Sequence, residues 1–206
     1  MFKEISKSYI KLLLRKGMRV SYSQFGEDAI LQNLLRKKYG VYVDIGAYHP
    51  TLYSNTYAFY RRGWKGVAID PNPWCEKLFK IMRPRDMFIR AAVGNSGEQE
   101  YYEYNDAACN SVGIPAPTRK DLKLVRTSQV KVAPLSELLR NIPHIDLMNI
   151  DVEGMDAEVM ETYDWHSFPS VLAVEGKLGD TSMDFLKGKG YELVGLAGAT
   201  MLFKHA

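Results

Sequence analysis

Short apolar segments recur along the chain, and segments with helical patterns lie between them. The apolar segments are expected to be strands, at residues 41–45, 66–69, 87–93, 145–150 and 171–174. The segments that precede, separate or follow them are expected to be helices, at residues 29–38, 55–62, 73–82, 157–162 and 182–189. Strands that alternate with helices predict an α/β, Rossmann-like fold, with a mainly parallel sheet and helices on both faces. Residues 191–195 and 200–204 flank Gly198 and predict a C-terminal antiparallel hairpin.

Residues 94–128 interrupt this alternation, because they are rich in Gly, Asn, Ser, Pro and Tyr. A strand at 130–132 and a short helix at 135–140 resume it. We interpret 95–128 as an irregular loop inserted into a single domain over 21–206, a length that suits one hydrophobic core. A loop of this length is either a lid or acceptor loop at a site, or a plain surface loop.

The charge and the cysteines bear on partners and on location. The net charge is only +3, and no nucleic-acid-binding signature appears, so no nucleic-acid partner is expected. Cys75 and Cys109 lack the spacing of a metal site, and no stretch reaches the roughly 20 apolar residues of a membrane span. A cytoplasmic location with reduced thiols is therefore expected.

Residues 1–20 carry six basic side chains and one acidic one. Their apolar positions fall among the basic residues in the pattern of an amphipathic helix. Such a helix packs on the domain or on a second copy in a homo-oligomer, or it contacts a membrane surface or another partner. A membrane contact would place the protein at the inner face of the membrane.

Two acids follow consecutive predicted strands. Asp44 ends the first strand, just before Gly46, and Asp70 follows the second strand 26 residues later. In open parallel sheets, ligands bind beyond the carboxyl ends of the strands. An acid placed like Asp70 can accept both ribose hydroxyls of an adenosine, and Gly46 lets backbone approach a ligand closely. The alternative is that Asp44 caps a helix or turn and that Asp70 is a turn aspartate.

The turn after the first strand contains a single glycine, in Gly46-Ala-Tyr-His-Pro-Thr51. Dinucleotide enzymes use three glycines there, so that a helix N-terminus can hold pyrophosphate. The turn therefore suits a nucleoside ligand without phosphate, such as S-adenosylmethionine. A nicotinamide-dependent oxidoreductase and a non-catalytic nucleotide-binding protein remain the alternatives.

Several segments resemble the FkbM family of methyltransferases. They occur in family order: Ser23-Gln-Phe-Gly-Glu-Asp28, Val43-Asp-Ile-Gly-Ala47, Ser54-Asn-Thr56, Gly63-Trp-Lys-Gly-Val-Ala-Ile-Asp-Pro-Asn-Pro73, Ala91-Ala-Val-Gly94, Asn149-Ile-Asp-Val-Glu-Gly154 and Ala173-Val-Glu175. The resemblance implies the seven-stranded methyltransferase fold, S-adenosylmethionine as cofactor, and usually a hydroxyl acceptor. Such proteins act on sugars of surface polysaccharides, glycolipids and nodulation signals, and on macrolide-type natural products. Residues 1–20 match nothing in that family.

The resemblance also implies a set of cofactor residues. By matching position, Asp44, Gly46, Asp70 and Ala92 would line the cofactor, and Gln24 and Asp151 would lie close to it. Neighbouring residues extend the predicted cofactor site, and they are Ala47, Tyr48, Asn55, Pro71, Asn72 and Ala91.

A hydroxyl acceptor needs a general base or a metal ion that lowers its pKa. Asp151 and Glu153 follow the strand at 145–150, can face the same side, and with Glu175 are the predicted catalytic carboxylates. Asp151 or Glu153 is the preferred base. Alternatively the three carboxylates hold a divalent cation, or Asp151 contacts the cofactor or a turn while Glu153 caps a helix. His49 is a further candidate base, or a turn histidine bonded to backbone.

The resemblance therefore implies an O-methyltransferase that acts on a sugar hydroxyl. The acceptor would be a carbohydrate or glycoconjugate, as a polysaccharide, a glycolipid or a precursor of either. The alternative acceptor is a small natural product.

Overall fold

The computed structural model describes residues 20–116, 118–152, 154–176 and 178–206. The predicted N-terminal amphipathic helix, apart from Val20, and the predicted catalytic residue Glu153 lie outside these ranges. Within them, no helix is long and apolar enough to cross a membrane.

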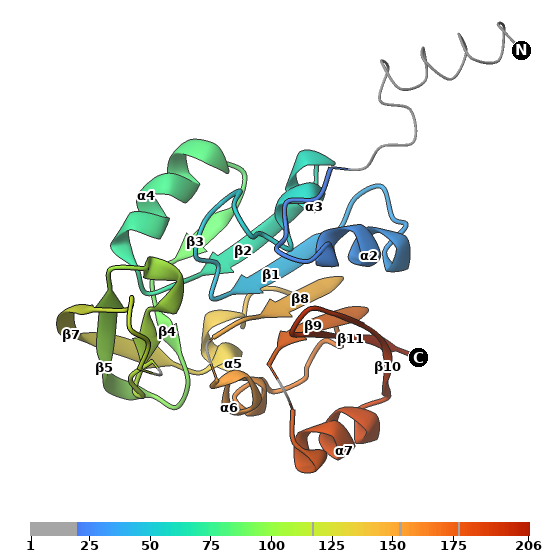
Figure 1. The fold of residues 1–206 in the computed structure, drawn as a ribbon. Helices are drawn as coiled ribbons and strands as arrows, with labels where there is room; N and C mark the ends of the chain where they lie inside the picture. The colour runs from blue at the N-terminus through green and yellow to red at the C-terminus, as the bar shows by residue number, and fades with distance from the viewer. Residues whose placement is uncertain (1–19, 117, 153, 177) are drawn as a thin grey trace, which may run out of the picture.

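The core of the described chain is a sheet of seven strands (Figure 1). The strands are β1 (Val41–Ile45), β2 (Lys65–Ile69), β3 (Met87–Ile89), β8 (Leu147–Ile150), β9 (Val171–Glu175), β10 (Tyr191–Ala197) and β11 (Thr200–His205). Their spatial order is β10-β11-β9-β8-β1-β2-β3. β3, β2, β1, β8 and β9 pair in parallel, whereas β11 runs antiparallel to both β9 and β10. This confirms the predicted Rossmann-like sheet with its C-terminal antiparallel hairpin.

Helices cover both faces of this sheet, as predicted. α2 (Glu27–Leu34), α3 (Tyr57–Arg61) and α4 (Pro73–Met82) lie on one face, and α5 (Leu135–Leu138), α6 (Asp156–Glu161) and α7 (Asp180–Gly188) lie on the other. Successive residues of a strand face opposite sides, so Tyr42 packs with Phe59 while Val43 packs in the cluster that contains Val159.

Local signals explain where α4 begins. The Asn72 side chain accepts a hydrogen bond from the backbone N–H of Trp74 at 2.9 Å, and Pro73 occupies the first helical position. The helix ends at Met82, as predicted, and Arg83 follows it with a fully buried side chain. The N-terminus of α4 thus begins directly beyond the end of β2.

A second sheet replaces the irregular loop that the sequence predicts at 95–128. Its strands are β4 (Ala92–Val93), β5 (Gly97–Tyr104), β6 (Ser111–Val112) and β7 (Leu124–Ala133), in the order β4-β7-β5-β6. A short 3₁₀ helix, η1 (Ala107–Cys109), precedes β6. The prediction of irregular structure is wrong for β5 and for the first part of β7, whereas the strand predicted at 130–132 lies within β7. The first part of β7 is solvent-exposed and so lacks a clear apolar alternation.

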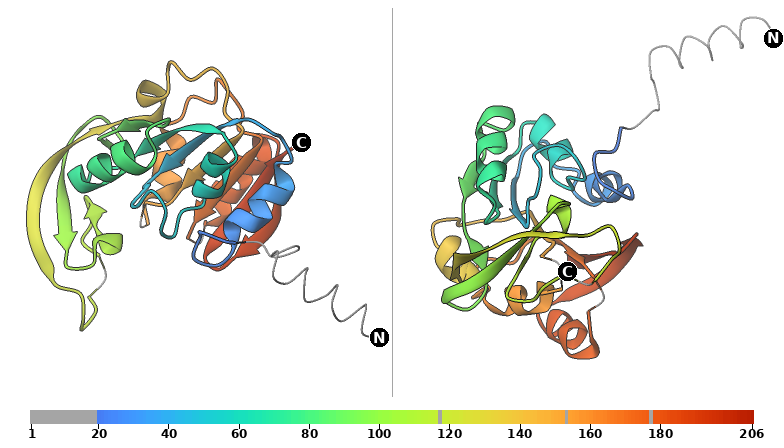
Figure 2. Two further views of the ribbon diagram at one scale, coloured as in Figure 1. Left: turned by 90° about the horizontal axis from the view of Figure 1, so that it is seen from above. Right: turned by 60° about the vertical axis from the view of Figure 1, so that its left-hand side comes forward.

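The predicted strand at 87–93 is also divided between the two sheets. β3 ends at Ile89 in the main sheet, and β4 begins at Ala92 in the second sheet, paired in parallel with β7. The chain changes sheets at this point, and Figure 2 shows β5 and β7 (green to yellow) standing to one side of the main sheet. The second sheet therefore starts next to the carboxyl ends of β1 and β2.

Candidate active site

A cavity of about 170 Å³ lies at the carboxyl ends of the main-sheet strands. Residues at and just beyond the carboxyl ends of β1, β2, β8 and β9 form one side of it, and residues of β5, η1 and β6 form another. All residues predicted for the cofactor border this cavity: Gln24, Asp44, Gly46, Ala47, Tyr48, Asn55, Asp70, Pro71, Asn72, Ala91, Ala92 and Asp151. The structure thus brings the predicted cofactor residues together in one place, while their roles stay predictions.

Gly46 holds the ends of β1 and β8 against each other. Its φ is +74°, and a Cβ at this position would overlap the backbone carbonyl oxygen of Asp151. The N–H of Asp151 donates to the carbonyl of Ile45 at 3.0 Å, and the N–H of Gly46 donates to the carbonyl of Ile69 at 2.9 Å. Glycine is therefore required here because the backbone of residue 46 lies close to the backbone of Asp151, whereas the sequence predicts that it approaches a ligand.

Asp70 is buried at the end of β2, with both oxygens oriented by backbone. Oδ2 accepts a hydrogen bond from Tyr48 N at 2.9 Å, and Oδ1 accepts one from Asn72 N at 2.8 Å. Burial raises the pKa of this carboxyl, and the two backbone hydrogen bonds act in the opposite direction. A carboxylate oxygen can accept more than one hydrogen bond, so Asp70 keeps acceptor capacity for two ligand hydroxyls.

Asp44 has a different environment, because other side chains engage both of its oxygens. Oδ1 accepts from Asn149 Nδ2 at 2.9 Å, and Oδ2 accepts from the Thr56 hydroxyl. The Oδ1 of Asn149 in turn accepts from Asn55 Nδ2 at 2.9 Å. These side chains are all buried, and only Thr56 does not border the cavity. Asp44 therefore orders side chains around the cavity and caps neither a helix nor a turn.

Sequence reasoning assigned no role to Thr56 or Asn149. Both occur in segments that resemble the family, Ser54-Asn-Thr56 and Asn149–Gly154. The signal was present, but nothing in the linear order shows that residues 44, 56 and 149 meet.

Two of the three predicted catalytic carboxylates, Asp151 and Glu175, border the cavity and are half-buried. The third, Glu153, lies outside the described residues. A further acid that the sequence did not single out, Asp156, accepts hydrogen bonds from Val152 N at 3.2 Å and Gly154 N at 3.3 Å. Burial raises the pKa of Asp156 to about 6. Asp156 thus supports the loop that carries Asp151.

His49 does not border the cavity. Its Nδ1 accepts hydrogen bonds from Thr51 N at 3.1 Å and Leu52 N at 3.0 Å, and burial lowers its pKa. Because the ring is used to close its own turn, the geometry favours the turn histidine over the predicted general base.

The second sheet supplies cavity residues that the sequence placed in a loop. The Nδ2 of Asn110 donates to the Tyr101 hydroxyl at 2.9 Å, and Asn110 Oδ1 accepts from Tyr104 N at 2.8 Å. Tyr101 is buried, and burial raises its pKa, so its hydroxyl stays protonated at neutral pH. Ser111 also borders the cavity, and its buried hydroxyl has no hydrogen-bond partner among the described residues.

The charges around the cavity bear on which ligands fit. Among the described residues that line it, the charged side chains are the acids Asp44, Asp70, Asp151 and Glu175, with no lysine, arginine or histidine. A phosphate-bearing dinucleotide would meet no cationic partner on this part of the wall, whereas a nucleoside with a cationic sulfonium suits it. The acidic lining of the cavity therefore fits S-adenosylmethionine.

A metal site is not formed by the residues that the structure describes. Within those ranges, no group of three or more His, Cys, Asp and Glu side chains is placed to hold a metal ion. The predicted trio of Asp151, Glu153 and Glu175 includes a residue outside the ranges, so it stays a prediction.

Comparison with known proteins gives one family and several distant structural similarities. No curated protein sequence matches this chain. Among solved structures, the chain is similar to a TehB-like SAM-dependent methyltransferase from Corynebacterium glutamicum, with 11% identity, a TM-score of 0.44, and 98% of this chain and 97% of that chain covered. It is also similar to a precorrin-6y C5,15-methyltransferase from Geobacter metallireducens, with 15% identity, a TM-score of 0.45, and coverages of 85% and 84%. A fibrillarin pre-rRNA processing protein from Methanococcus jannaschii has 13% identity and a TM-score of 0.46, with coverages of 92% and 71%. At these values the structural similarities carry no statement about substrate. The family model that matches is described as the methyltransferase FkbM domain, and it matches residues 44–193, most of the chain.

Proposed function

Because this chain belongs to the FkbM methyltransferase family, we propose that this S-adenosylmethionine-dependent methyltransferase methylates a sugar hydroxyl of a polysaccharide, a glycolipid or one of their precursors. The proposal has a methyl-donor half, binding of S-adenosylmethionine, and an acceptor half. The observation that carries the methyl-donor half is Asp70, a buried carboxylate at the end of β2 whose two oxygens are each held by one backbone N–H. The family resemblance supports the hydroxyl acceptor.

The donor side of the cavity is formed by residues after β1 and β2 and at β4. Asp70, with each oxygen already held by one backbone N–H, would accept hydrogen bonds from the two ribose hydroxyls. The small side chains of Ala91 and Ala92 leave room for the flat face of an adenine. When bound, S-adenosylmethionine supplies an electrophilic methyl group on a positively charged sulfur.

The acceptor side holds the carboxylates that can take a proton. Asp151 or Glu175, each half-buried at the cavity, accepts the proton of the acceptor hydroxyl at a carboxylate oxygen. Glu153 is the third candidate base from the sequence. A divalent cation held by these acids is the alternative way to make the hydroxyl more nucleophilic.

The second sheet is the proposed wall of the acceptor site. Tyr101 and Ser111 present hydroxyl groups that suit hydrogen bonds to a polyol.

We place the enzyme in the cytoplasm, with residues 1–20 as the contact to the inner face of the membrane, to a partner or to a second copy of the chain.

The experiment has two arms that use the full chain. In the first, calorimetry measures binding of S-adenosylhomocysteine to the wild type and to Asp70→Ala, with a titration of NADH alongside. We expect binding by the wild type, at least tenfold weaker binding by the variant, and no heat with NADH. No affinity for S-adenosylhomocysteine would overturn the donor half.

The second arm incubates the enzyme with radiolabelled S-adenosylmethionine and cell-envelope extract, with and without EDTA. We expect label in a carbohydrate fraction that periodate or acid hydrolysis releases, and the same yield with EDTA. Loss of labelling with EDTA would favour the cation. Label confined to a low-mass, non-carbohydrate fraction would indicate a small natural product instead.

A further inference from the structure

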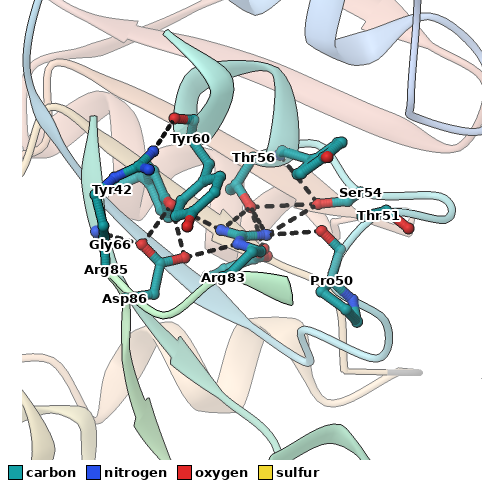
Figure 3. Close-up of polar contacts among 12 residues, drawn as sticks. Tyr42, Pro50, Thr51, Ser54, Thr56, Tyr60, Gly66, Arg83, Arg85 and Asp86 are labelled. Carbon is teal, nitrogen blue, oxygen red and sulfur yellow. Dashed lines mark hydrogen bonds and ion pairs between the residues drawn. The ribbon is translucent and has the colours of Figure 1, made fainter. Parts of the chain in front are cut away.

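Arg83, which follows α4, is the largest charged side chain buried in the described structure (Figure 3). Its Nε donates to Asp86 Oδ2 at 2.7 Å, and both side chains of this ion pair are fully buried. Its guanidinium group lies over the ring of Phe79, 4.7 Å from the ring centre. Burial of a cation has a large desolvation cost unless its donors are all used, so the remaining contacts of this group are informative.

Apart from a hydrogen bond from Nη2 to the Tyr42 hydroxyl of β1 at 2.8 Å, those contacts join Arg83 to the segment between β1 and α3. Nη1 donates to the carbonyl of Pro50 at 3.3 Å and to Ser54 Oγ at 3.4 Å, and both Nη1 and Nη2 donate to Thr56 Oγ1 at 3.1 Å. Figure 3 shows these three residues converging on the guanidinium group. The segment that Arg83 holds includes Asn55, which borders the cavity.

The Thr56 hydroxyl does not cap the helix that it precedes. It occupies the N-cap position of α3, where a threonine hydroxyl ordinarily accepts a backbone N–H of the helix, but it makes no such bond. The Ser54 hydroxyl accepts from Tyr57 N instead, at 3.1 Å. The Thr56 hydroxyl donates its proton to Asp44 Oδ2 and accepts the Arg83 N–H groups, and its oxygen also lies 3.3 Å from Ser54 Oγ.

The Thr56 hydroxyl therefore stands between a buried cation and a buried carboxylate. Asp44 is the point from which the cavity side chains are ordered, because it accepts from Asn149, and Asn149 accepts from Asn55. Thr56 is fully buried, and Asp44 is 3% exposed, so this line of contacts runs without solvent from Arg83 to the cavity wall. A low local dielectric strengthens each of these hydrogen bonds and makes a broken one costly.

We propose that Arg83 and Thr56 are positioning residues for the methyl-donor site, in which the Arg83 guanidinium, through the Thr56 hydroxyl, holds the Asp44 carboxylate that orders Asn149 and Asn55. This inference rests on the proposed function, because it concerns affinity for the donor. Neither Arg83 nor Thr56 borders the cavity, so any effect on that affinity is transmitted through the residues that they contact, of which Asp44 and Ser54 border it.

The test is calorimetry of S-adenosylhomocysteine binding by the full chain, well below the unfolding temperature of every variant. Thr56→Val keeps the shape of the side chain and removes the hydroxyl, and it leaves α3 with the capping bond of Ser54. We expect Thr56→Val to bind roughly tenfold more weakly than the wild type, because a buried carboxylate loses one of its donors. Thr56→Ser restores the hydroxyl and should bind within about threefold of the wild type.

The matched control is Tyr191→Phe on β10. The Tyr191 hydroxyl is buried and donates to the carbonyl of Pro169 at 2.8 Å, on the opposite face of the sheet from Thr56. We expect this variant to have a lower unfolding temperature and unchanged affinity. Wild-type affinity in Thr56→Val, or equal weakening in Tyr191→Phe, would overturn the inference and leave the proposed function intact.

A fallback covers the case in which Thr56→Val does not fold. Tyr42→Phe removes the hydroxyl that accepts from Arg83 Nη2 at 2.8 Å and keeps the packed ring. It should weaken binding about threefold, and unchanged affinity in this variant would count against the inference. Absence of binding by the wild type would instead be a failure of the proposed function.

Discussion

At the scale of single residues, Gly46, which borders the cavity, and Asp156, which does not, both stabilise its wall. Gly46 permits the contact between the ends of β1 and β8, and Asp156 holds the backbone of the loop after β8. Both act on Asp151, the first through its carbonyl oxygen and the second through the loop that follows it. The geometry of the proposed base therefore depends on residues that do no chemistry themselves.

Gly46→Ala should destabilise the fold. A methyl group there meets the Asp151 carbonyl, and the φ of +74° is itself unfavourable for alanine, so we expect a loss of roughly 3 kcal/mol or more in the free energy of unfolding. Urea unfolding measures it. The control is Gly188→Ala at the end of α7, where an added Cβ has nothing within 4 Å and stability should stay equal or rise. Equal losses in the two variants would contradict the steric explanation.

Asp156 should make stability depend on pH between about 4 and 6. Its pKa in the folded protein, about 6, lies above the ordinary value of an aspartate, so the folded state binds this proton more tightly than the unfolded state. Its contribution is therefore complete below about pH 4 and is lost as the pH rises through 6, by roughly 3 kcal/mol. Urea unfolding of the wild type and of Asp156→Asn at pH 4.5 and 7 should show the wild type falling relative to the variant. A constant difference would argue against this pKa.

At the scale of elements, the second sheet differs most from what the sequence indicates. The residues of β7 mostly face solvent, so the apolar alternation that identifies a strand is weak. What stabilises β5 and β7 is their long antiparallel pairing, from Gly97 opposite Val132 to Tyr104 opposite Leu124. Pairing between segments that lie this far apart in the chain depends on the tertiary structure, so local sequence patterns do not predict it.

β5 offers a test of the proposed acceptor wall. Tyr101 is buried at the cavity, and the adjacent Tyr102 projects from the opposite face of the strand. Tyr101→Ala should raise the KM for the acceptor at least tenfold in the labelling assay and leave S-adenosylhomocysteine affinity within about threefold. Tyr102→Ala is the control and should change neither. A loss of donor affinity in Tyr101→Ala would place this wall on the donor side.

At the scale of the whole molecule, the site joins distant parts of the chain. The cavity is bordered by residues from Gln24 to Glu175, so its wall brings together the N-terminal part of the described chain, both sheets and the carboxyl ends of four main-sheet strands. Binding to the folded state alone stabilises the whole fold by mass action.

S-adenosylhomocysteine should therefore raise the unfolding temperature. At a ligand concentration 100 times its Kd, the gain is about 2.7 kcal/mol, or roughly 5–10 °C at this chain length. Differential scanning fluorimetry checks it, with adenosine diphosphate as the control ligand that should give no shift. A shift with the diphosphate of equal size would mean that the cavity accepts pyrophosphate after all.

The amino-acid sequence by itself determined the elements whose packing is local and strongly patterned. β1 and α4 occur at the predicted residues, because their signals are local. β1 is a short apolar run, and α4 begins with Pro73 directly after the capping residue Asn72. Motifs at the ends of strands also predicted the donor residues, because the carboxyl ends of parallel strands meet at one edge of the sheet.

Only the tertiary structure decided how Asp44 and Asp70 differ. Both lie at the ends of consecutive strands, yet Asp70 is held by the backbone N–H groups of Tyr48 and Asn72, while Asp44 is held by the side chains of Thr56 and Asn149. The role of Arg83 is likewise decided by the tertiary structure, because nothing in the sequence distinguishes this arginine, whereas the fold buries it beside Asp86 and Thr56. The physical reason is that burial and side-chain partners are set by which distant segments pack together, whereas the strand ends are set by local pattern.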